Sequence, residues 1–260
     1  MEGALRGNIW VEQHGKADGK PLVLLHGLGA NGAVWDPILP FVAEEWDGPC
    51  IVPDFPGHGR SSAPGAYSFG TFCADVAQCL DGCGPVSIIG HSLGGALGAL
   101  LACGWFGVEV DCLLALSVKT DWTETELAKF DEVSRKPPRY FATEADAREK
   151  FLRASGLGGV FRTGDRFVDA GIRQEPEGFR FAADQRVIGS TGRQLDVILH
   201  AQQARMRMAT GGEDAMAPLS GMMPYDHDAV EIPGAGHNVH AERPEDVWRL
   251  FRNFCDTRQS

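Results

Sequence analysis

The sequence predicts one α/β domain: a mostly parallel, twisted sheet with helices on both faces and an inserted, mostly helical cap. A chain of 260 residues, 43% of them hydrophobic, is long enough for one large core. Short apolar runs recur in its first half, each followed by a loop and a helical pattern, at residues 21–25, 50–53, 86–89 and 112–117. Runs without polar alternation are typical of strands buried on both faces, as in a parallel sheet.

The character of the chain changes between residues 119 and 200, where strand-like runs become rare and charged residues more frequent. Helix-capping patterns begin at Thr123 and Thr143, each followed three residues later by an acidic residue. We therefore expect residues 119–200 to form a helical cap, and residues 1–118 and 201–260 to form the core of the domain.

Strand patterns return toward the end of this segment and after it. Residues 178–182 alternate as in a short extended piece, and residues 205–209 and 229–232 are expected to be strands of the sheet. Apolar residues with helical spacing then predict a closing helix over residues 244–254, with a proline suited to its first turn.

The chain carries a formal charge of −11, from 24 Lys and Arg against 35 Asp and Glu. Such a charge disfavours nucleic acid and anionic membranes as partners. The sequence contains no run of about 18 apolar residues, so no membrane-spanning helix is expected. The first residues lack the apolar core of a signal peptide. We expect a small-molecule substrate, no nucleic-acid or membrane partner, and a monomer or homodimer.

Seven cysteines are scattered along the chain without the spacing of a metal site. We interpret them as reduced, mostly buried residues of a cytoplasmic protein. No metal ion and no organic cofactor are expected.

The run Gly90-His91-Ser92-Leu93-Gly94 has the form G-x-S-x-G and joins an apolar strand to a helix rich in small residues. A serine on such a sharp strand-to-helix turn has strained backbone angles, and the flanking glycines remove side chains that would clash. We expect Ser92 to be a nucleophile, lifted clear of the sheet. A nucleophilic serine needs a base, an orienting acid and an oxyanion site.

The base candidate is His237, in a glycine-rich loop that follows the last expected strand. Such a loop can place an imidazole over the carboxyl edge of the sheet. Of the eight histidines in the chain, His240 is the nearest rival, because it follows three residues later. His26 and His58 lie in turns, where a structural role is favoured.

The acid candidate is Asp214, just after the expected strand that ends near residue 209. Its carboxylate would hold the second imidazole N–H of the base, fix the tautomer and stabilise the imidazolium. Two alternatives remain open: Glu213, which is adjacent, and Asp121, which follows an earlier strand.

The oxyanion site needs two preorganised backbone N–H groups. One is expected from Leu93, directly after the nucleophile. The other is expected from Leu28, in the glycine-rich turn Leu25-His26-Gly27-Leu28-Gly29 that follows an early strand.

Four side chains are candidates for contact with a substrate: Trp35, His91, Lys119 and Trp122. Trp35 and Trp122 could line an apolar pocket, and packing in the core or cap is the competing interpretation. His91 adjoins the nucleophile, so its side chain is expected to point away from it. Lys119 lies where the cap leaves the sheet. A basic cluster at residues 135–139 could bind a carboxylate or phosphate, and a solvated turn is the alternative.

Together these motifs resemble the α/β-hydrolase fold superfamily over nearly the whole chain. The order Ser92, Asp214, His237 matches the Ser…Asp…His order of that family. Residues 25–29 look like its oxyanion turn, and Asp54-Phe55-Pro56-Gly57-His58-Gly59-Arg60-Ser61 resembles its structural Asp-x-Pro-Gly-x-Gly-x-Ser loop. The expected cap also lies where this family places its lid.

The resemblance implies a serine hydrolase that cleaves a small carboxylic ester, thioester or lactone through an acyl-enzyme on Ser92. A serine at this position argues against the haloalkane dehalogenase and epoxide hydrolase branches, which use an aspartate there. Because fold does not fix substrate, alternatives stay open. They are a carbon–carbon bond hydrolase, a non-hydrolytic lyase or perhydrolase, and a ligand receptor with slow turnover.

Overall fold

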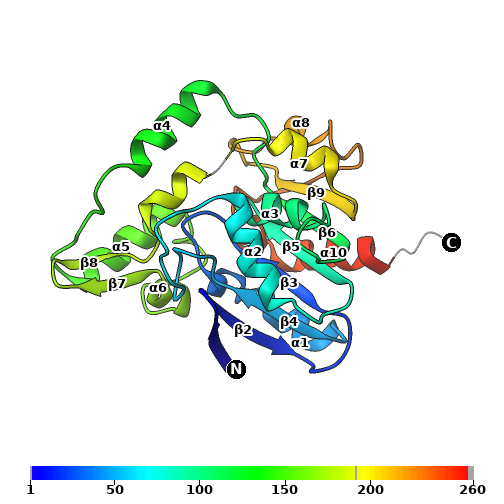
Figure 1. The fold of residues 1–260 in the computed structure, drawn as a ribbon, viewed down its shortest axis with the longest axis horizontal. Helices are drawn as coiled ribbons and strands as arrows, with labels where there is room; N and C mark the ends of the chain where they lie inside the picture. The colour runs from blue at the N-terminus through cyan, green and yellow to red at the C-terminus, as the bar shows by residue number, and fades with distance from the viewer. Residues whose placement is uncertain (1, 191, 257–260) are drawn as a thin grey trace.

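A computed structural model describes residues 2–190 and 192–256 (Figure 1). Its centre is an eight-stranded sheet in the order β1-β2-β4-β3-β5-β6-β9-β10. Strand β2 runs antiparallel to both neighbours. The six strands β4, β3, β5, β6, β9 and β10, in their order across the sheet, run parallel to one another, which confirms the expected mostly parallel sheet. The strands are β1 (Glu2–Arg6), β2 (Ile9–Gly15), β3 (Leu22–Leu25), β4 (Pro49–Pro53), β5 (Val86–His91), β6 (Val110–Leu116), β9 (Arg205–Gly211) and β10 (Val230–Ile232).

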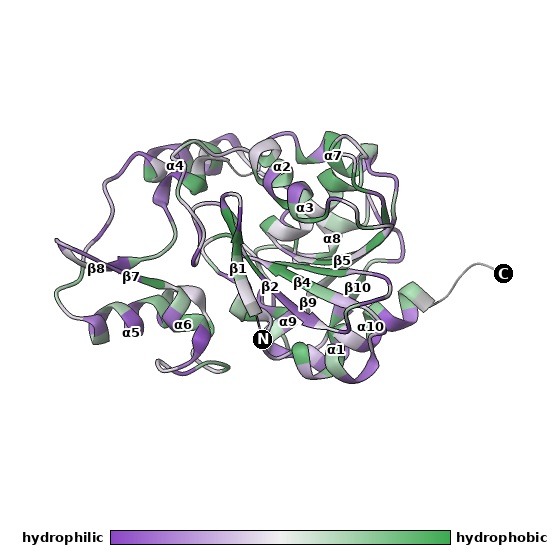
Figure 2. Cartoon of the chain, turned by 60° about the horizontal axis from the view of Figure 1, so that its bottom comes forward, coloured by the Kyte–Doolittle hydropathy of each residue, from purple (hydrophilic) through white to green (hydrophobic). Residues whose placement is uncertain are grey.

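Helices cover both faces of the sheet, which explains the continuous apolar runs. In β5, for example, Ile88 belongs to one hydrophobic core and Ile89 to the other, and both are fully buried. The first core includes α2 (Phe69–Cys79), α3 (Leu93–Leu101) and α7 (Leu195–Ala201), and the second includes α1 (Leu39–Glu45), α9 (Val239–Glu242) and α10 (Pro244–Asp256). Figure 2 shows the two sets of helices on opposite sides of the sheet. Two short helices, η1 (Gly32–Trp35) and α8 (Leu219–Met222), lie in connections.

The inserted segment lies between β6 and β9, to the left in Figure 1. Both expected helix starts are present: the hydroxyls of Thr123 and Thr143 accept N–H groups at the beginning of α4 and α5. The segment also contains an antiparallel hairpin, and its second strand, Gly178–Phe181, confirms the extended piece expected at residues 178–182. Its elements are α4 (Glu124–Ser134), α5 (Glu144–Ser155), α6 (Arg166–Ala170), β7 (Ile172–Glu175), β8 (Gly178–Phe181) and η2 (Gln185–Ser190).

Helix α7 falls largely within the range expected for the cap, but it packs as part of the core. Its side chains Leu195, Ile198 and Leu199 are buried in the same hydrophobic cluster as α3. The projecting part of the insertion therefore ends before Leu195, and its side chains Phe151 and Phe167 join it to the second core.

A disulfide joins Cys112 on β6 to Cys255 on α10, 143 residues later. The expectation that all seven cysteines are reduced is therefore wrong for this pair. The other five are free, and among them only Cys83 is exposed. Disulfides persist in oxidising compartments, so the expected cytoplasmic location loses the support of the cysteines. No helix in the two described ranges is long and apolar enough to cross a bilayer.

We predict that Cys255→Ser lowers the free energy of unfolding by about 2–4 kcal/mol, because the cross-link limits the conformations of a long unfolded loop. Urea unfolding with and without a reductant measures this. Cys83→Ser, which removes an exposed free thiol, is the matched control and should unfold like the parent. Seven reactive thiols in the denatured, unreduced protein would contradict the cross-link.

Candidate active site

Ser92 occupies the sharp turn between β5 and α3. Its backbone angles, φ 51° and ψ −112°, lie in a region that residues other than glycine rarely adopt. The Ser92 N–H donates to the carbonyl of Leu116 at the end of the neighbouring strand β6, at 2.8 Å. Such strain costs of order 1–3 kcal/mol and persists only where surrounding packing imposes it.

The two glycines of the motif explain how this turn closes. A Cβ atom on Gly94 would lie 2.1 Å from the carbonyl oxygen of Leu25, and one on Gly90 would lie 2.4 Å from the carbonyl oxygen of Gly94. No side chain fits at either position. The first turn of α3 is therefore pressed against the end of β3, and Ser92 is lifted at the carboxyl edge of the sheet.

Asp214 and His237 meet at the same edge, from the loops after β9 and β10. The Nδ1 atom of His237 lies 2.9 Å from Oδ2 of Asp214. The other carboxylate oxygen accepts the N–H groups of Met216 and Ala217 at 2.9 and 3.2 Å. The Thr210 hydroxyl, which donates to the carbonyl of Ala217 at 2.7 Å, lies 3.3 Å from Oδ2. Both oxygens of Asp214 thus accept hydrogen bonds, while Nε2 of His237 takes no part in the contact with Asp214.

The environment of Asp214 favours its charged form. Burial alone would raise the pKa of this carboxyl, but the hydrogen bond from His237, the imidazole's charge and the two backbone N–H groups lower it to about 2. The carboxylate is therefore ionised at neutral pH. It fixes the His237 tautomer with the proton on Nδ1, and Nε2 is left as an acceptor.

The imidazole of His237 lies close to His91, the residue before Ser92. The His91 and His237 ring centroids are 4.9 Å apart, and His91 directly precedes Ser92. Across residues 2–190 and 192–256, the Ser92 hydroxyl makes no hydrogen bond to the imidazole. Catalytic hydrogen bonds are often long in unliganded enzymes and shorten when a substrate binds.

One residue expected to supply an oxyanion N–H directly follows the nucleophile, and the other belongs to a turn that lies close to it. Leu93 is the first residue of α3, so its N–H has no acceptor within the helix. Gly27, which precedes Leu28, lies close to the serine, because a Cβ there would be 3.5 Å from the Ser92 Cβ. The turn that carries Leu28 is thus next to the nucleophile.

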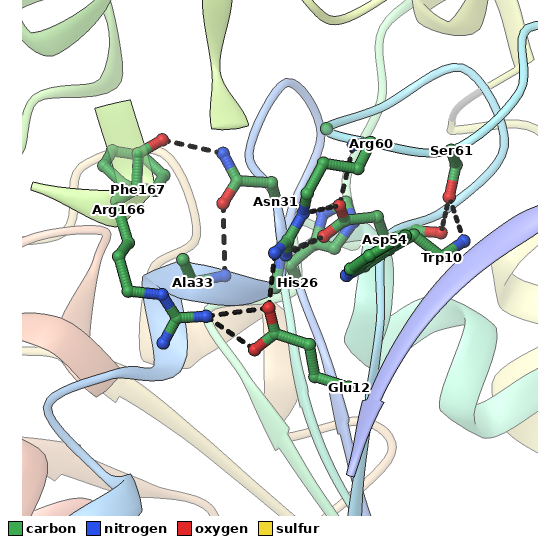
Figure 3. A network of polar contacts seen from close by, with 12 residues as sticks. Trp10, Glu12, His26, Asn31, Ala33, Asp54, Arg60, Ser61, Arg166 and Phe167 are labelled. Carbon is green, nitrogen blue, oxygen red and sulfur yellow. Dashed lines mark hydrogen bonds and ion pairs between the residues drawn. The ribbon is translucent and has the colours of Figure 1, made fainter. Parts of the chain in front are cut away.

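Polar contacts tie this turn to the rest of the molecule (Figure 3). The Asn31 side-chain oxygen accepts the N–H of Ala33 at 3.1 Å, and its amide donates to the carbonyl of Phe167 in α6 at 2.9 Å. Oδ1 of Asp54 accepts the N–H of Gly32 at 2.6 Å. The segment that directly follows the oxyanion turn is therefore anchored both to the loop after β4 and to the inserted segment, and His26 of the turn itself accepts the N–H of Phe55 at 2.9 Å.

A second part of this network is centred on Glu12, a buried residue of β2 (Figure 3). Arg166 of α6 reaches both of its oxygens, at 2.7 and 2.6 Å, and also contacts Asp36 at 3.2 Å. Arg60 pairs with Glu12 from the other side. Burial alone would raise the pKa of Glu12, but hydrogen bonds from His14, Arg166 and Arg60 hold it well below its usual range. Sequence reasoning missed this charge cluster, since its members are far apart in the chain.

Two of the four substrate candidates are buried in the structure. Trp35 is 0% exposed and packs on the ring of His240, as the competing interpretation of core packing expects. His91 is 4% exposed, and its Nε2 contacts the carbonyl of His237.

The other two candidates contact each other at the start of α4. Lys119 pairs with Glu126 at 2.9 Å and lies 5.3 Å from the ring centre of Trp122, whose indole N–H donates to the Lys119 carbonyl. These contacts secure the entry to the inserted segment. The basic cluster at 135–139 is exposed.

The rival catalytic residues lie elsewhere. Glu213 and Asp121 are exposed, and the acid that contacts His237 is Asp214. His240 is fully buried and packs between Trp35 and His91.

Two open clefts of about 420 and 410 Å³ lie away from the triad candidates. The first lies between residues 59–62 and residues 169–173, and the second lies around the end of α5. Neither is lined by Ser92 or His237, so neither is an acyl pocket as it stands.

Comparison with known proteins identifies the family. The model of the alpha/beta hydrolase family matches residues 22–250, which is most of the chain. The chain belongs to the α/β-hydrolase family.

Several relatives in this family are named as hydrolases. A serine hydrolase-like protein of Danio rerio is 27% identical over 97% of this chain and 85% of its own length. A 2-(acetamidomethylene)succinate hydrolase of Mesorhizobium japonicum is 25% identical over 96% of this chain and 93% of its own. A magnesium-chelatase 30 kDa subunit of Rhodobacter capsulatus is 39% identical, but the match covers only 36% of this chain and 34% of that protein.

Solved structures share the fold. The crystal structure of E-2-(acetamidomethylene)succinate hydrolase has a TM-score of 0.76 and 21% identity, with 98% of this chain and all of that chain covered. An esterase of M. tuberculosis has a TM-score of 0.77 and 21% identity over 98% of this chain and 91% of its own. At these identities the likeness establishes the fold alone.

We predict that Asp214 contributes a pH-dependent part of the stability. Its folded pKa of about 2 lies below its ordinary value of 3.8, so the contribution is present above about pH 4 and is lost as the pH falls toward 2. Asp214→Asn lacks this titration, so the gap in unfolding free energy between parent and variant should shrink by about 2 kcal/mol over that range. Urea unfolding from pH 6 to pH 2 measures the gap, and a constant gap would contradict the assignment.

Proposed function

We propose that the protein is a serine hydrolase that cleaves a small-molecule carboxylic ester, thioester or lactone through an acyl-enzyme on Ser92. One observation carries the proposal: a serine with strained backbone angles stands at the same sheet edge as a hydrogen-bonded Asp214–His237 pair. An ionised acid, an imidazole whose Nε2 takes no part in the bond to that acid, and a half-buried turn serine are the parts that acyl transfer requires.

In the proposed mechanism, Nε2 of His237 takes the Ser92 proton as the hydroxyl oxygen attacks the substrate carbonyl. The negative charge that develops on the carbonyl oxygen is stabilised by the N–H groups of Leu28 and Leu93. The resulting imidazolium is stabilised by the Asp214 carboxylate and gives its proton to the leaving group.

Water then completes the cycle. His237 removes a proton from the water as it attacks the acyl carbonyl, and the proton returns to the Ser92 oxygen as the acyl bond breaks. The products are the free acid and the alcohol, or the thiol, of the substrate. The proposal needs no metal ion and no organic cofactor.

The comparisons support a hydrolase and leave the substrate open. Relatives and structural neighbours are named for hydrolysis of a succinate derivative, for thioesterase and for esterase activity. A carbon–carbon bond hydrolase would use the same residues, so the substrate class needs a direct test.

We also propose that the part of residues 119–200 that precedes α7 acts as the cap. It is attached next to the oxyanion turn, where α6 contacts Asn31 and Glu12. This placement gives it a route to influence the site.

We predict that Ser92→Ala lowers kcat for p-nitrophenyl esters by roughly 10³- to 10⁶-fold, because no other group replaces the nucleophile. A chain-length series of esters measures this loss and also sizes the acyl pocket. Ser62→Ala, which changes an exposed serine, is the matched control and should retain activity.

A fluorophosphonate probe tests the nucleophile without a guess about the substrate. The parent should be labelled on the peptide that contains Ser92, and Ser92→Ala should not. Undiminished turnover by Ser92→Ala, or a folded parent that neither hydrolyses esters nor reacts with the probe, would refute the proposed function.

A further inference from the structure

A buried imidazole outside the triad contacts the histidine loop. His91 is the last residue of β5 and directly precedes Ser92. Its side chain is 4% exposed, and its Nε2 lies 2.8 Å from the main-chain oxygen of His237. A carbonyl oxygen can only accept a hydrogen bond. The His91 proton must therefore be on Nε2, and the ring donates to the backbone of the residue proposed as the base.

The same ring also contacts the oxyanion turn. A Cβ on Gly27 would lie 2.7 Å from Nδ1 and 3.1 Å from Cε1 of His91. A side chain there would have to displace the imidazole. The backbone of the turn therefore rests directly on the edge of the His91 ring, one residue before Leu28.

Neighbouring rings prevent His91 from turning away. Its centroid is 4.9 Å from that of His237 and 4.2 Å from that of His240, which in turn lies 4.5 Å from Trp35. Burial lowers the pKa of His91 well below its ordinary range and that of His240 to about 3, so both rings are neutral. The neutral state of His91 supplies the single N–H that the His237 carbonyl accepts.

We propose that His91 is a positioning residue that holds the base loop and the oxyanion turn in register with Ser92. This inference rests on the proposed function. His237 is then held at two points: Asp214 fixes its ring through Nδ1, and His91 fixes its main chain through the carbonyl oxygen. Neighbouring residues of the loop have other partners, since Glu242 accepts the N–H of Gly236 and Glu213 donates to the carbonyl of Ala235, but the bond from His91 acts on the main chain of His237 itself.

Loss of this contact affects the transition state more than substrate binding. The His91 side chain is buried and bonded to the main chain of His237, so KM should change little. A base displaced by about 1 Å can cost on the order of 10²-fold in rate. The expected result is a fall in kcat with KM nearly constant.

The test compares three replacements of His91. His91→Leu removes the donor and should slow both ester turnover and fluorophosphonate labelling of Ser92 by about 10- to 100-fold. His91→Gln places an amide N–H at a similar reach to Nε2 and should restore most of the rate. His91→Asn carries the same amide on a shorter side chain, cannot reach the His237 carbonyl, and should remain slow.

A buried aromatic residue at the other end of the sheet provides the matched control. Trp46 is 8% exposed, and its indole N–H donates to the main-chain carbonyl of Lys20, just before β3, at 2.9 Å. Trp46→Leu should lower the melting temperature to an extent comparable with His91→Leu, yet leave the labelling rate of Ser92 unchanged. A rate that falls with stability in both variants would overturn the positioning role.

Other outcomes are also decisive. Labelling of His91→Leu at the parental rate would overturn the inference, and so would equal rates for His91→Gln and His91→Asn. If His91→Leu fails to fold, the rates of His91→Gln and His91→Asn still decide whether a donor at the position of Nε2 is required. A parent that is not labelled, or a Ser92→Ala variant that is labelled, would instead refute the proposed function, together with the inference that rests on it.

Discussion

The site depends on the close approach of α3 to the end of β3. Gly94 lies so near the Leu25 carbonyl that no side chain fits, and this contact forces Ser92 into its unfavourable backbone angles. The strain of about 1–3 kcal/mol is offset by the burial of α3. Leu97 and Leu101 of this helix are fully buried, and each such side chain contributes roughly 1.5–3 kcal/mol. The core therefore supplies the free energy that holds the serine in place.

The remaining parts of the site are arranged around that turn because parallel strands end at the same edge. Asp214 follows β9 and His237 follows β10, and these strands pair with each other in register, Val230 opposite Ala209. The register brings together two residues that are 23 positions apart. Gly27 and His91 then connect them to the nucleophile. Each loop is thus fixed by the strand before it and by one neighbouring loop.

The sequence predicts the parts of this molecule that have local signals. Ser92, Asp214 and His237 each follow a recognisable strand in a turn rich in small residues, so their positions could be inferred. Trp35 could not be placed in the core from sequence, because its burial depends on His240, some two hundred residues later. The same holds for the pairing of Cys112 with Cys255 and of Glu12 with Arg166: each joins residues that only the complete fold brings together. Local sequence patterns predict helices, strands and their ends, whereas packing between distant parts of the chain decides which side chains are buried and which are exposed.

The helices of the inserted segment differ in how firmly they are bound to the core, and this difference matters for the proposed role of the segment as a cap. Helix α6 is held by the Arg166–Glu12 ion pair and by the Asn31 amide, whereas α4 has no buried residue. A buried carboxylate is costly to leave unpaired, but Arg60 would still neutralise Glu12 if Arg166 moved away. Displacement of α6 would nevertheless break the bond to Asn31, just after the expected oxyanion turn. Displacement of α4 would break few buried contacts and would leave that bond intact, so it costs less free energy.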